Sequence, residues 1–202
     1  MDLKLIREKF GDDYTADSHT FKMGIDRRIT LPIAKRFKNR IVLETCTGAG
    51  FTTISLAREA AKVITVDINR AHQKQAIMNA EKAKVKERIL FVTGDTLNDH
   101  LLKALPRFDS AFIDPDWADT APGHTYRFLN SNTKPPADIL LEKIISYTQD
   151  AALILPPAVN TVELKSLPPF ELQKIFLDGD FVLYCLYFGH LISSIGKTEL
   201  YV

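Results

Sequence analysis

Short, continuously apolar segments alternate along the chain with segments that are rich in Ala, Glu, Lys and Gln. The apolar segments read as strands that are buried on both faces of a sheet, and they occupy residues 41–43, 63–66, 89–92, 111–113 and 151–155. Residues 52–61 and 71–84, which lie between them, have the composition of helices. This alternation predicts an α/β, Rossmann-like fold, with a parallel sheet and helices on both faces.

The end of the chain has a different pattern. Residues 170–177 and 181–188 are rich in aromatic residues and flank Asp178-Gly179-Asp180. An Asp-Gly pair between two such segments predicts an antiparallel hairpin. We therefore expect a seven-stranded, mostly parallel sheet that ends in a C-terminal antiparallel hairpin. Residues 1–24 are expected to form a helix and a lead-in, and residues 25–202 a single domain.

Composition and charge exclude several classes of protein. The chain has 202 residues, 46% of them hydrophobic, and a net charge of +1. These values suit one domain with a substantial core, and they argue against a disordered polyelectrolyte or a histone-like protein. Cys46 and Cys185 lie in apolar segments and are expected to be reduced. The charged N-terminus does not resemble a signal peptide and no segment is long enough to span a bilayer, so we expect a soluble, cytoplasmic protein.

A glycine turn follows the first predicted strand. Gly48 and Gly50 would allow the backbone to turn tightly and to approach a ligand, and the helix behind them would offer free N–H groups. Asp67 ends the second strand, where a carboxylate can accept hydrogen bonds from a ribose. The alternative is a turn that only connects strand and helix. Together these features predict a nucleotide-like cofactor.

Two acidic residues bear on which cofactor binds. Glu44, near the end of the first strand, could attract an amine or a sulfonium, for which a nicotinamide site has no need. Thr53 occupies the position where a dinucleotide motif has a third small residue. Asp95, after Gly94, could accept a hydrogen bond from an adenine amino group, or could cap a turn.

The fourth strand ends at Asp114-Pro115-Asp116-Trp117, and a segment without clear periodicity follows up to about residue 137. Long loops of this kind are often functional. The Asp114 carboxylate could hold an exocyclic amine, and Trp117, the single tryptophan, could stack on a planar base. The alternative is that Asp114 caps a turn and Trp117 belongs to the core.

These motifs resemble those of class I S-adenosylmethionine (SAM)-dependent methyltransferases. Within that group, residues 25 to 192 are most similar to the RNA cap guanine-N2 methyltransferases, the trimethylguanosine synthase family. The similarity lies in residues 30–34, 44–50, 66–68, 79–81, 94–95, 155–156 and 187–191. The chain differs from the family at the fourth motif, where Asp116 replaces a second proline and Ala118-Asp119 replace two glycines.

The resemblance implies a role for each motif. Glu44 and the turn with Cys46, Gly48 and Gly50 would hold the amino-acid part of SAM, which the segment starting at Thr30 would cover. Asp67 would bind the ribose, and Ile68, Gly94 and Asp95 would surround the adenine. Asp114, Pro115 and Trp117 would be the catalytic residues, with Asp114 also near the cofactor, and Asp116 and Trp117 would contact the guanine.

The basic residues are concentrated in two segments. Residues 22–40 contain seven Lys and Arg against one acidic residue, and Arg27 and Arg28 in this segment are candidates for phosphate contacts. A solvated helix face is the alternative, which we favour for the second segment, residues 70–88. The five histidines, including His124 in the long loop, show no metal-ligand spacing.

These expectations combine into one hypothesis, in which the chain methylates an exocyclic amine of a guanine in RNA or in a nucleotide and uses SAM as cofactor. The alternatives are a nicotinamide-dependent oxidoreductase and a non-catalytic module that binds SAM or RNA.

Overall fold

The computed structural model describes residues 2–117 and 125–202, and the chain folds into two compact units. The first unit spans Met1–Asp109 and the second Ser110–Val202. The predicted boundary at residue 24 does not coincide with this division and stays a prediction. Ala118, Asp119 and His124 lie outside the described residues.

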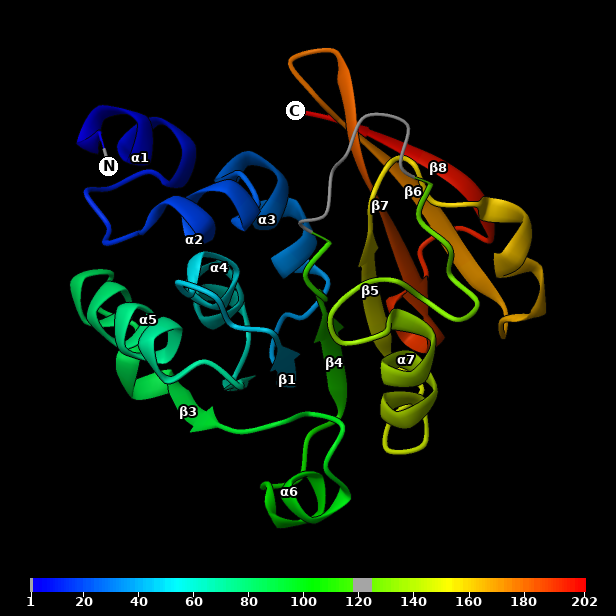
Figure 1. Cartoon of the computed structure of the whole chain (residues 1–202), viewed down its shortest axis with the longest axis horizontal. Helices are drawn as coiled ribbons and strands as arrows, with labels where there is room; N and C mark the ends of the chain where they lie inside the picture. Colours follow the sequence, from blue (N-terminus) through cyan, green and yellow to red (C-terminus); the bar gives the residue numbers. More distant parts are fainter. Residues whose placement is uncertain (1, 118–124) are drawn as a thin grey trace. The chain divides into compact units, whose positions relative to one another are not determined.

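The first unit, coloured from blue to green in Figure 1, contains three parallel strands in the order β3-β2-β1. The strands are β1 (Ile41–Thr45), β2 (Lys62–Asp67) and β3 (Ile89–Thr93). The helices are α1 (Leu3–Phe10), α2 (Ser18–Met23), α3 (Arg27–Lys35), α4 (Phe51–Glu59), α5 (Arg70–Lys82) and α6 (Asp99–Ala104), with a 3₁₀ turn, η1, at Lys86–Arg88. Almost every residue of β1 and β2 is buried, which agrees with the continuously apolar pattern of these segments.

The N-terminal segment packs against the start of α4. Ile6, Phe10 and Tyr14 share a core cluster with Phe51 and Ile54. The rings of Phe10 and Phe51 are stacked, with centroids 3.5 Å apart and planes at 10°. The predicted single helix is in fact two short helices, each capped by the aspartate before it, Asp2 for α1 and Asp17 for α2.

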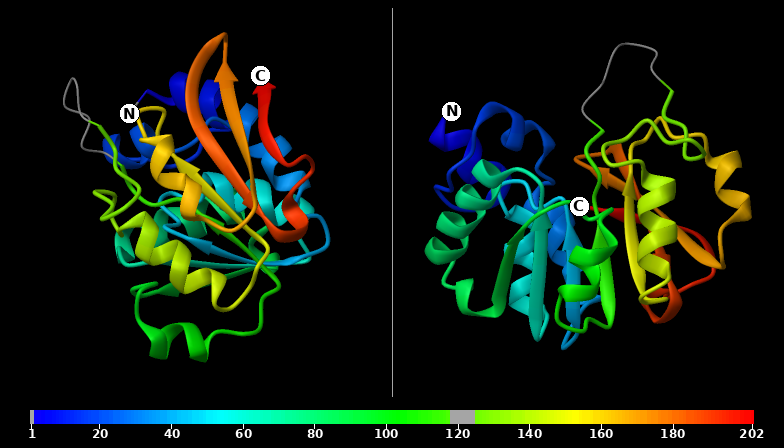
Figure 2. Two further views of the ribbon diagram at one scale, coloured as in Figure 1. Left: turned by 90° about the vertical axis from the view of Figure 1, so that its right-hand side faces the viewer. Right: turned by 60° about the horizontal axis from the view of Figure 1, so that its bottom comes forward.

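The second unit, coloured from green to red in Figure 2, contains five strands in the order β4-β5-β7-β6-β8. The strands are β4 (Ser110–Ile113), β5 (Ala151–Leu155), β6 (Phe170–Leu177), β7 (Asp180–Phe188) and β8 (Gly196–Tyr201). The helix α7 (Ala137–Ile145) contacts β4 and β5, and 3₁₀ turns lie at η2 (Thr161–Ser166) and η3 (Gly189–Leu191).

The predicted C-terminal hairpin is confirmed. β6 and β7 pair in antiparallel fashion, and Leu177 pairs with Asp180 across a two-residue turn. Asp178 and Gly179 both have positive φ, 53° and 91°, as a type I′ turn requires. This turn type explains why an Asp-Gly pair was sufficient to predict the hairpin.

The predicted α/β fold class is confirmed, with one strand more than expected. β8 pairs in parallel with β6, and its residues are exposed or half-buried. A strand at the edge of a sheet has little apolar pattern, because only part of it is covered, so no sequence signal pointed to β8. Among the described residues, no helix combines the length and apolar character that crossing a bilayer needs.

Candidate functional site

The glycine turn between β1 and α4 is confirmed in its predicted place. Cys46, Gly48 and Gly50 all have positive φ, at 61°, 54° and 80°. A Cβ atom on Gly50 would lie 2.8 Å from the Ala76 Cβ and 3.0 Å from its Cα, so α5 can approach only because residue 50 is a glycine. A Cβ atom on Gly48 would meet nothing within 4 Å. The turn is therefore packed on the α5 side at Gly50 and open at Gly48.

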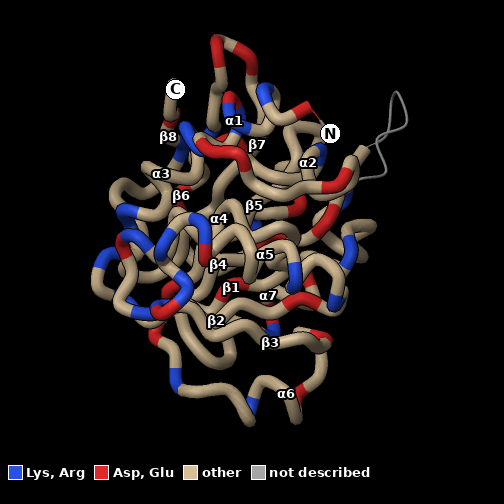
Figure 3. The backbone as a smooth tube through the Cα atoms, turned by 90° about the vertical axis from the view of Figure 1, so that its left-hand side faces the viewer, with Lys and Arg blue, Asp and Glu red and all other residues tan. Residues whose placement is uncertain are grey.

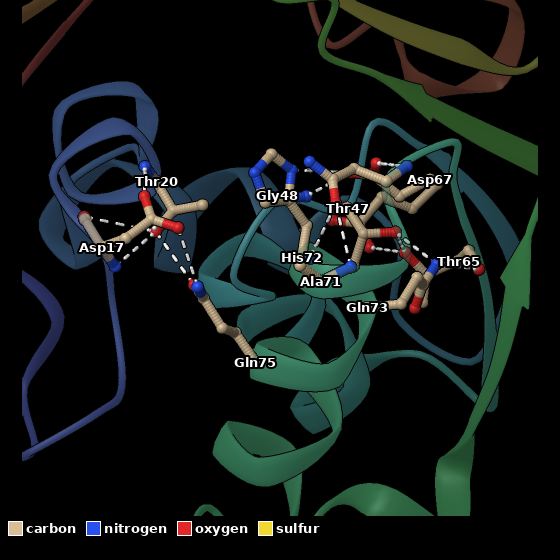
Figure 4. Close-up of polar contacts among 12 residues, drawn as sticks. Asp17, Thr20, Thr47, Gly48, Thr65, Asp67, Ala71, His72, Gln73 and Gln75 are labelled. Carbon is tan, nitrogen blue, oxygen red and sulfur yellow. Dashed lines mark hydrogen bonds and ion pairs between the residues drawn. The ribbon is translucent and has the colours of Figure 1, made fainter.

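Asp67, at the end of β2, holds this turn in shape (Figure 4). Its Oδ2 accepts a hydrogen bond from the Gly48 N–H (2.8 Å), and its Oδ1 accepts one from the Asn69 N–H (2.7 Å). The His72 Nδ1 lies 3.8 Å from the same Oδ2. Each carboxylate oxygen has two lone pairs, so Asp67 can still accept hydrogen bonds from a ligand. The sequence predicted a ligand contact here but not the bond to the turn.

Glu44 is buried behind the turn, with a relative exposure of 2%. Its Oε2 accepts hydrogen bonds from the Thr53 Oγ1 (2.5 Å) and the Thr65 Oγ1 (2.6 Å). The pKa of this carboxyl is raised to about 7, chiefly by burial; the two threonine hydrogen bonds lower the pKa and the charge of Asp67 raises it, both by less. A cation at the turn would reverse this shift by stabilising the carboxylate.

A chain of hydrogen bonds continues from Glu44 to α5. The Thr65 hydroxyl donates to Glu44, so the Thr47 hydroxyl, 2.7 Å away, donates to Thr65. Gln73 Nε2 in turn donates to the Thr47 Oγ1 (3.1 Å), as Figure 4 shows. Every hydrogen bond in this chain is therefore directed toward Glu44. Sequence reasoning missed Thr47, Thr65 and Gln73, because their partners are far apart in the sequence.

Asn79 joins α5 to both the glycine turn and the N-terminal segment. Its Nδ2 donates to the carbonyls of Ala49 (2.9 Å) and Thr15 (2.8 Å), and its Oδ1 accepts from the Thr15 N–H (2.7 Å). The side chain is almost fully buried. The sequence marked Asn79 only as part of a family motif, and the structure gives it three backbone partners.

Asn79→Ala is expected to lower the free energy of unfolding by about 2–4 kcal/mol, because it leaves buried backbone groups unpaired. Urea denaturation measures this change. Gln75→Ala is the matched control on the same helix, because the half-buried Gln75 bonds to the side chains of Asp17 and Thr20 and not to backbone groups (Figure 4). Equal losses in the two variants would contradict the role of Asn79.

The other predicted cofactor residues of the first unit have varied environments. Ile68 has a relative exposure of 73%, so its apolar side chain is available to a ligand. The Gly94 N–H donates to the Asp67 carbonyl (3.0 Å), and the exposed Asp95 accepts from the Leu97 N–H (2.8 Å). Asp95 thus caps a turn, which is the alternative role that the sequence left open. Thr30 is buried, and its hydroxyl lies 2.7 Å from that of Ser55, so it links α3 to α4.

The predicted acceptor motif follows β4 in the second unit. Pro115 is buried, whereas Asp114, Asp116 and Trp117 are half-buried. Asp116 forms a backbone bridge with Lys134, in which each N–H donates to the carbonyl of the other residue (2.9 and 2.8 Å). The motif is therefore fixed at the base of the long loop.

Tyr126, which sequence reasoning missed, supports Trp117. The two rings pack edge to face, with centroids 6.4 Å apart and planes at 84°, and the Tyr126 hydroxyl donates to the Trp117 carbonyl. Tyr126 is itself buried and its backbone pairs with Ala158 and Asn160. An aromatic residue in a loop of mixed composition was the one signal that could have found it.

The two predicted phosphate contacts, Arg27 and Arg28, are both exposed at the start of α3. Arg28 forms an ion pair with Asp26 (3.2 Å). A Cβ atom on Gly11 would lie 2.6 Å from the Arg27 Nη1, so the Arg27 guanidinium lies close to the end of α1. Figure 3 shows the Lys and Arg positions along the chain. The role of both arginines toward phosphate stays a prediction.

Comparison with known proteins identifies the family. Residues 39–186 match the model of the RNA cap guanine-N2 methyltransferases, which is well over half of the chain. The chain belongs to this family. The predicted resemblance to class I SAM-dependent methyltransferases is thus confirmed, and SAM is the cofactor of the fold and the family.

Relatives of the chain match it over different shares of their length. It is 37% identical to the catechol O-methyltransferase of Mycobacterium tuberculosis over 87 residues, which are 42% of this chain and 40% of the relative. A crystal structure described as a methyltransferase from Porphyromonas gingivalis W83 covers 96% of this chain at a TM-score of 0.75 and 17% identity. The chain spans only 49% of that protein's length.

A third match has a bound product. The structure of M. capricolum TrmK in complex with S-adenosylhomocysteine covers 88% of this chain and 71% of its own chain, with a TM-score of 0.55 and 15% identity. At these identities, the structural matches show the shared fold alone.

The residues of the first unit fit SAM. The open side of the turn at Gly48 leaves room for a ligand, the buried Glu44 carboxyl needs a cation to ionise easily, and Asp67 has acceptor capacity left for a ribose. The ammonium and sulfonium groups of SAM would provide that cation. Glu44 and the turn would hold the amino-acid part of SAM, and Asp67 and Ile68 its nucleoside.

The raised pKa of Glu44 predicts two effects of pH. Without ligand, the protonated form is favoured by folding, so the free energy of unfolding should fall, by on the order of 3 kcal/mol, as pH rises from about 5 to about 8. Affinity for SAM should rise over the same range, because the cation favours the carboxylate. Urea denaturation and calorimetry measure these two trends.

Glu44→Gln is the control, because glutamine keeps the shape and an acceptor oxygen but does not titrate. Both trends should flatten in this variant. If the variant retained the full pH dependence of the wild type, the titrating group would not be Glu44.

Proposed function

We propose that this chain transfers a methyl group from SAM to an exocyclic amine of a guanine in RNA or in a nucleotide. Glu44, the glycine turn and Asp67 of the first unit bind the donor, and Asp114, Pro115 and Trp117 of the second unit serve the acceptor. When bound, SAM supplies a methyl group that is already activated by the adjacent sulfonium.

The observation that supports a nucleobase acceptor most directly is the way Trp117 is held. The Tyr126 ring packs edge to face with the indole, and its hydroxyl bonds to the Trp117 carbonyl. Asp116, the residue before Trp117, is bridged to Lys134. A half-buried indole that is held in this way is suited to stack on a planar base, which is worth about 1–3 kcal/mol.

Two exposed cations in the segments that hold the aromatic pair support an acceptor with phosphate. Directly opposed residues of an antiparallel bridge have their side chains on the same face, so Lys134 lies on the face of Asp116. Arg127 follows Tyr126 in the chain, and both cations are exposed. Base stacking and phosphate contact together favour a nucleotide or RNA over a small amine.

Asp114 has the central role in the chemistry. Its carboxylate accepts a hydrogen bond from the acceptor amine, which orients the nitrogen lone pair and stabilises the positive charge that develops on nitrogen. Alignment of the reacting groups can contribute about 7–11 kcal/mol, so a covalent enzyme intermediate is unnecessary. The methylated amine can lose its proton afterwards to water.

A second candidate is a module that binds SAM or RNA without catalysis. The departure at Asp116, where the family has proline, favours this candidate, because it changes the motif that faces the acceptor. The nicotinamide alternative has no support from the family match.

Fluorescence of Trp117 tests the acceptor site, because the chain has a single tryptophan. A guanine nucleotide should quench it in a saturable manner and more strongly than the adenine nucleotide does. Tyr126→Phe, which removes the hydroxyl that bonds to Trp117, should weaken this binding. A free tryptophan derivative controls for collisional quenching, and equal quenching of protein and derivative would refute the base platform.

A further inference from the structure

The last strand of the second unit has an unpaired edge. β8 stands at the end of the strand order and pairs with β6 on one side, and no other strand of the described residues lies against its outer side (Figure 1). The outer backbone groups of such a strand can accept another strand. This edge is independent of the residues assigned to methyl transfer.

The exposed side chains of β8 are arranged symmetrically around Thr198. Lys197 and Glu199 flank it directly, and Ile195 and Tyr201 lie three residues to either side. Since side chains alternate along a strand, Lys197, Glu199 and Tyr201 lie on one face, and Ile195 directly precedes the strand. Ile195 and Tyr201 are unusually exposed for large apolar residues, at 81% and 64%.

We propose that β8 is a homodimer interface, in which it pairs in antiparallel fashion with β8 of a second copy about a two-fold axis at Thr198. This register places Lys197 opposite Glu199 of the second copy, and Glu199 opposite its Lys197. It also places Ile195 of each copy opposite Tyr201 of the other copy. Opposed residues on one face of an antiparallel pair contact each other, so each charge gains a partner of opposite sign.

The charges and rings of β8 suit this partner. Within the described part of the chain, neither Lys197 nor Glu199 has an ion-pair partner, although Glu199 accepts a hydrogen bond from the Tyr201 hydroxyl (2.6 Å). The Tyr201 ring is stacked on Phe176 of β6, with centroids 4.6 Å apart and planes at 9°. This stacking holds Tyr201 in place without covering it, so little side-chain entropy is lost on association.

The dimer is expected to be weak. One strand edge with four side chains is smaller than a standard interface of about 800 Å² per partner, so the dissociation constant should lie in the micromolar range or above. Sedimentation velocity over a series of protein concentrations measures it. The wild-type chain should shift from monomer to dimer as its concentration rises, and a monomer at every concentration would overturn the proposal.

Charge reversal tests the register. In Lys197→Glu, and equally in Glu199→Lys, like charges would oppose each other at both symmetric positions, so the dissociation constant should rise at least tenfold. An equimolar mixture of the two variants pairs opposite charges at both positions again and should form a heterodimer. The double variant, with both changes in one chain, should dimerise as the wild type does.

Lys165→Glu, a charge reversal at an exposed lysine of η2, is the matched control and should dimerise normally. The mixing experiment does not depend on the effect of either variant alone, because each protein serves as the other's partner. If the single variants dimerised like the wild type, or if their mixture stayed monomeric, β8 would not be the interface. Lys and Glu would then serve only to keep the edge from pairing.

Discussion

Asp114→Ala should lower the rate of methyl transfer about 100-fold to 1,000-fold and leave the affinity for SAM within about twofold of the wild type. The proposed role of Asp114 is to orient the amine and stabilise the charge that grows on it, and this role matters only when an acceptor reacts. Single-turnover methyl transfer gives the rate, and calorimetry with SAM gives the affinity.

Two further variants distinguish this role from a general one. Asp114→Asn keeps an acceptor oxygen without the charge, so it should retain more activity than the alanine variant. Asp116→Ala should have a smaller effect, because the bridge of Asp116 to Lys134 uses backbone groups that alanine also has. Equal loss of rate and of SAM affinity in Asp114→Ala would refute the assignment of Asp114 to the acceptor.

Asp67→Ala is expected to have the largest effect on the cofactor, a loss of about 100-fold or more in affinity for SAM. The carboxylate is 8% exposed and accepts hydrogen bonds from the turn at Gly48 and from Asn69. Its removal would take away the proposed charged contact with SAM and would also release the turn at Gly48. Truncation of a buried, hydrogen-bonded charge at a binding site costs about 2–5 kcal/mol.

The control for Asp67 is Asp95→Ala. Asp95 is exposed and bonds to Leu97 in its own turn, so its loss should weaken binding less than the loss of Asp67. Calorimetry with SAM measures both variants, and thermal denaturation shows whether they remain folded. A folded Asp67→Ala protein with wild-type affinity for SAM would exclude Asp67 from the site.

The fold and the main landmarks of the site were predictable because their signals are local. Buried parallel strands are continuously apolar, the Asp178-Gly179 turn needs residues that tolerate positive φ, and the same holds for the glycine turn. The position of Asp67 at the end of β2 was predicted from the apolar pattern, and its contact with a ligand stays a prediction. None of these inferences required knowledge of distant contacts.

The remaining features depend on contacts between residues far apart in the sequence. Thr53 and Thr65 hold Glu44 across two elements, and Asn79 bonds to Thr15, 64 residues away. Each of these residue types is common in helices or strands for other reasons, so the sequence alone did not reveal these hydrogen bonds. β8 was missed for a different reason, since an exposed edge strand has no buried face to mark it.

The central claim is that this chain methylates an exocyclic amine of guanine, and labelled methyl transfer from SAM tests it most directly. The wild-type protein and Asp114→Ala are incubated with labelled SAM and, in separate reactions, with RNA, free nucleotides and a protein extract. RNA and nucleotide products are then digested to nucleosides and separated. We predict that the label appears on the exocyclic amine of guanosine with the wild type and is nearly lost with Asp114→Ala. Label on a hydroxyl group or on protein, or no transfer by a protein that binds SAM, would contradict the account.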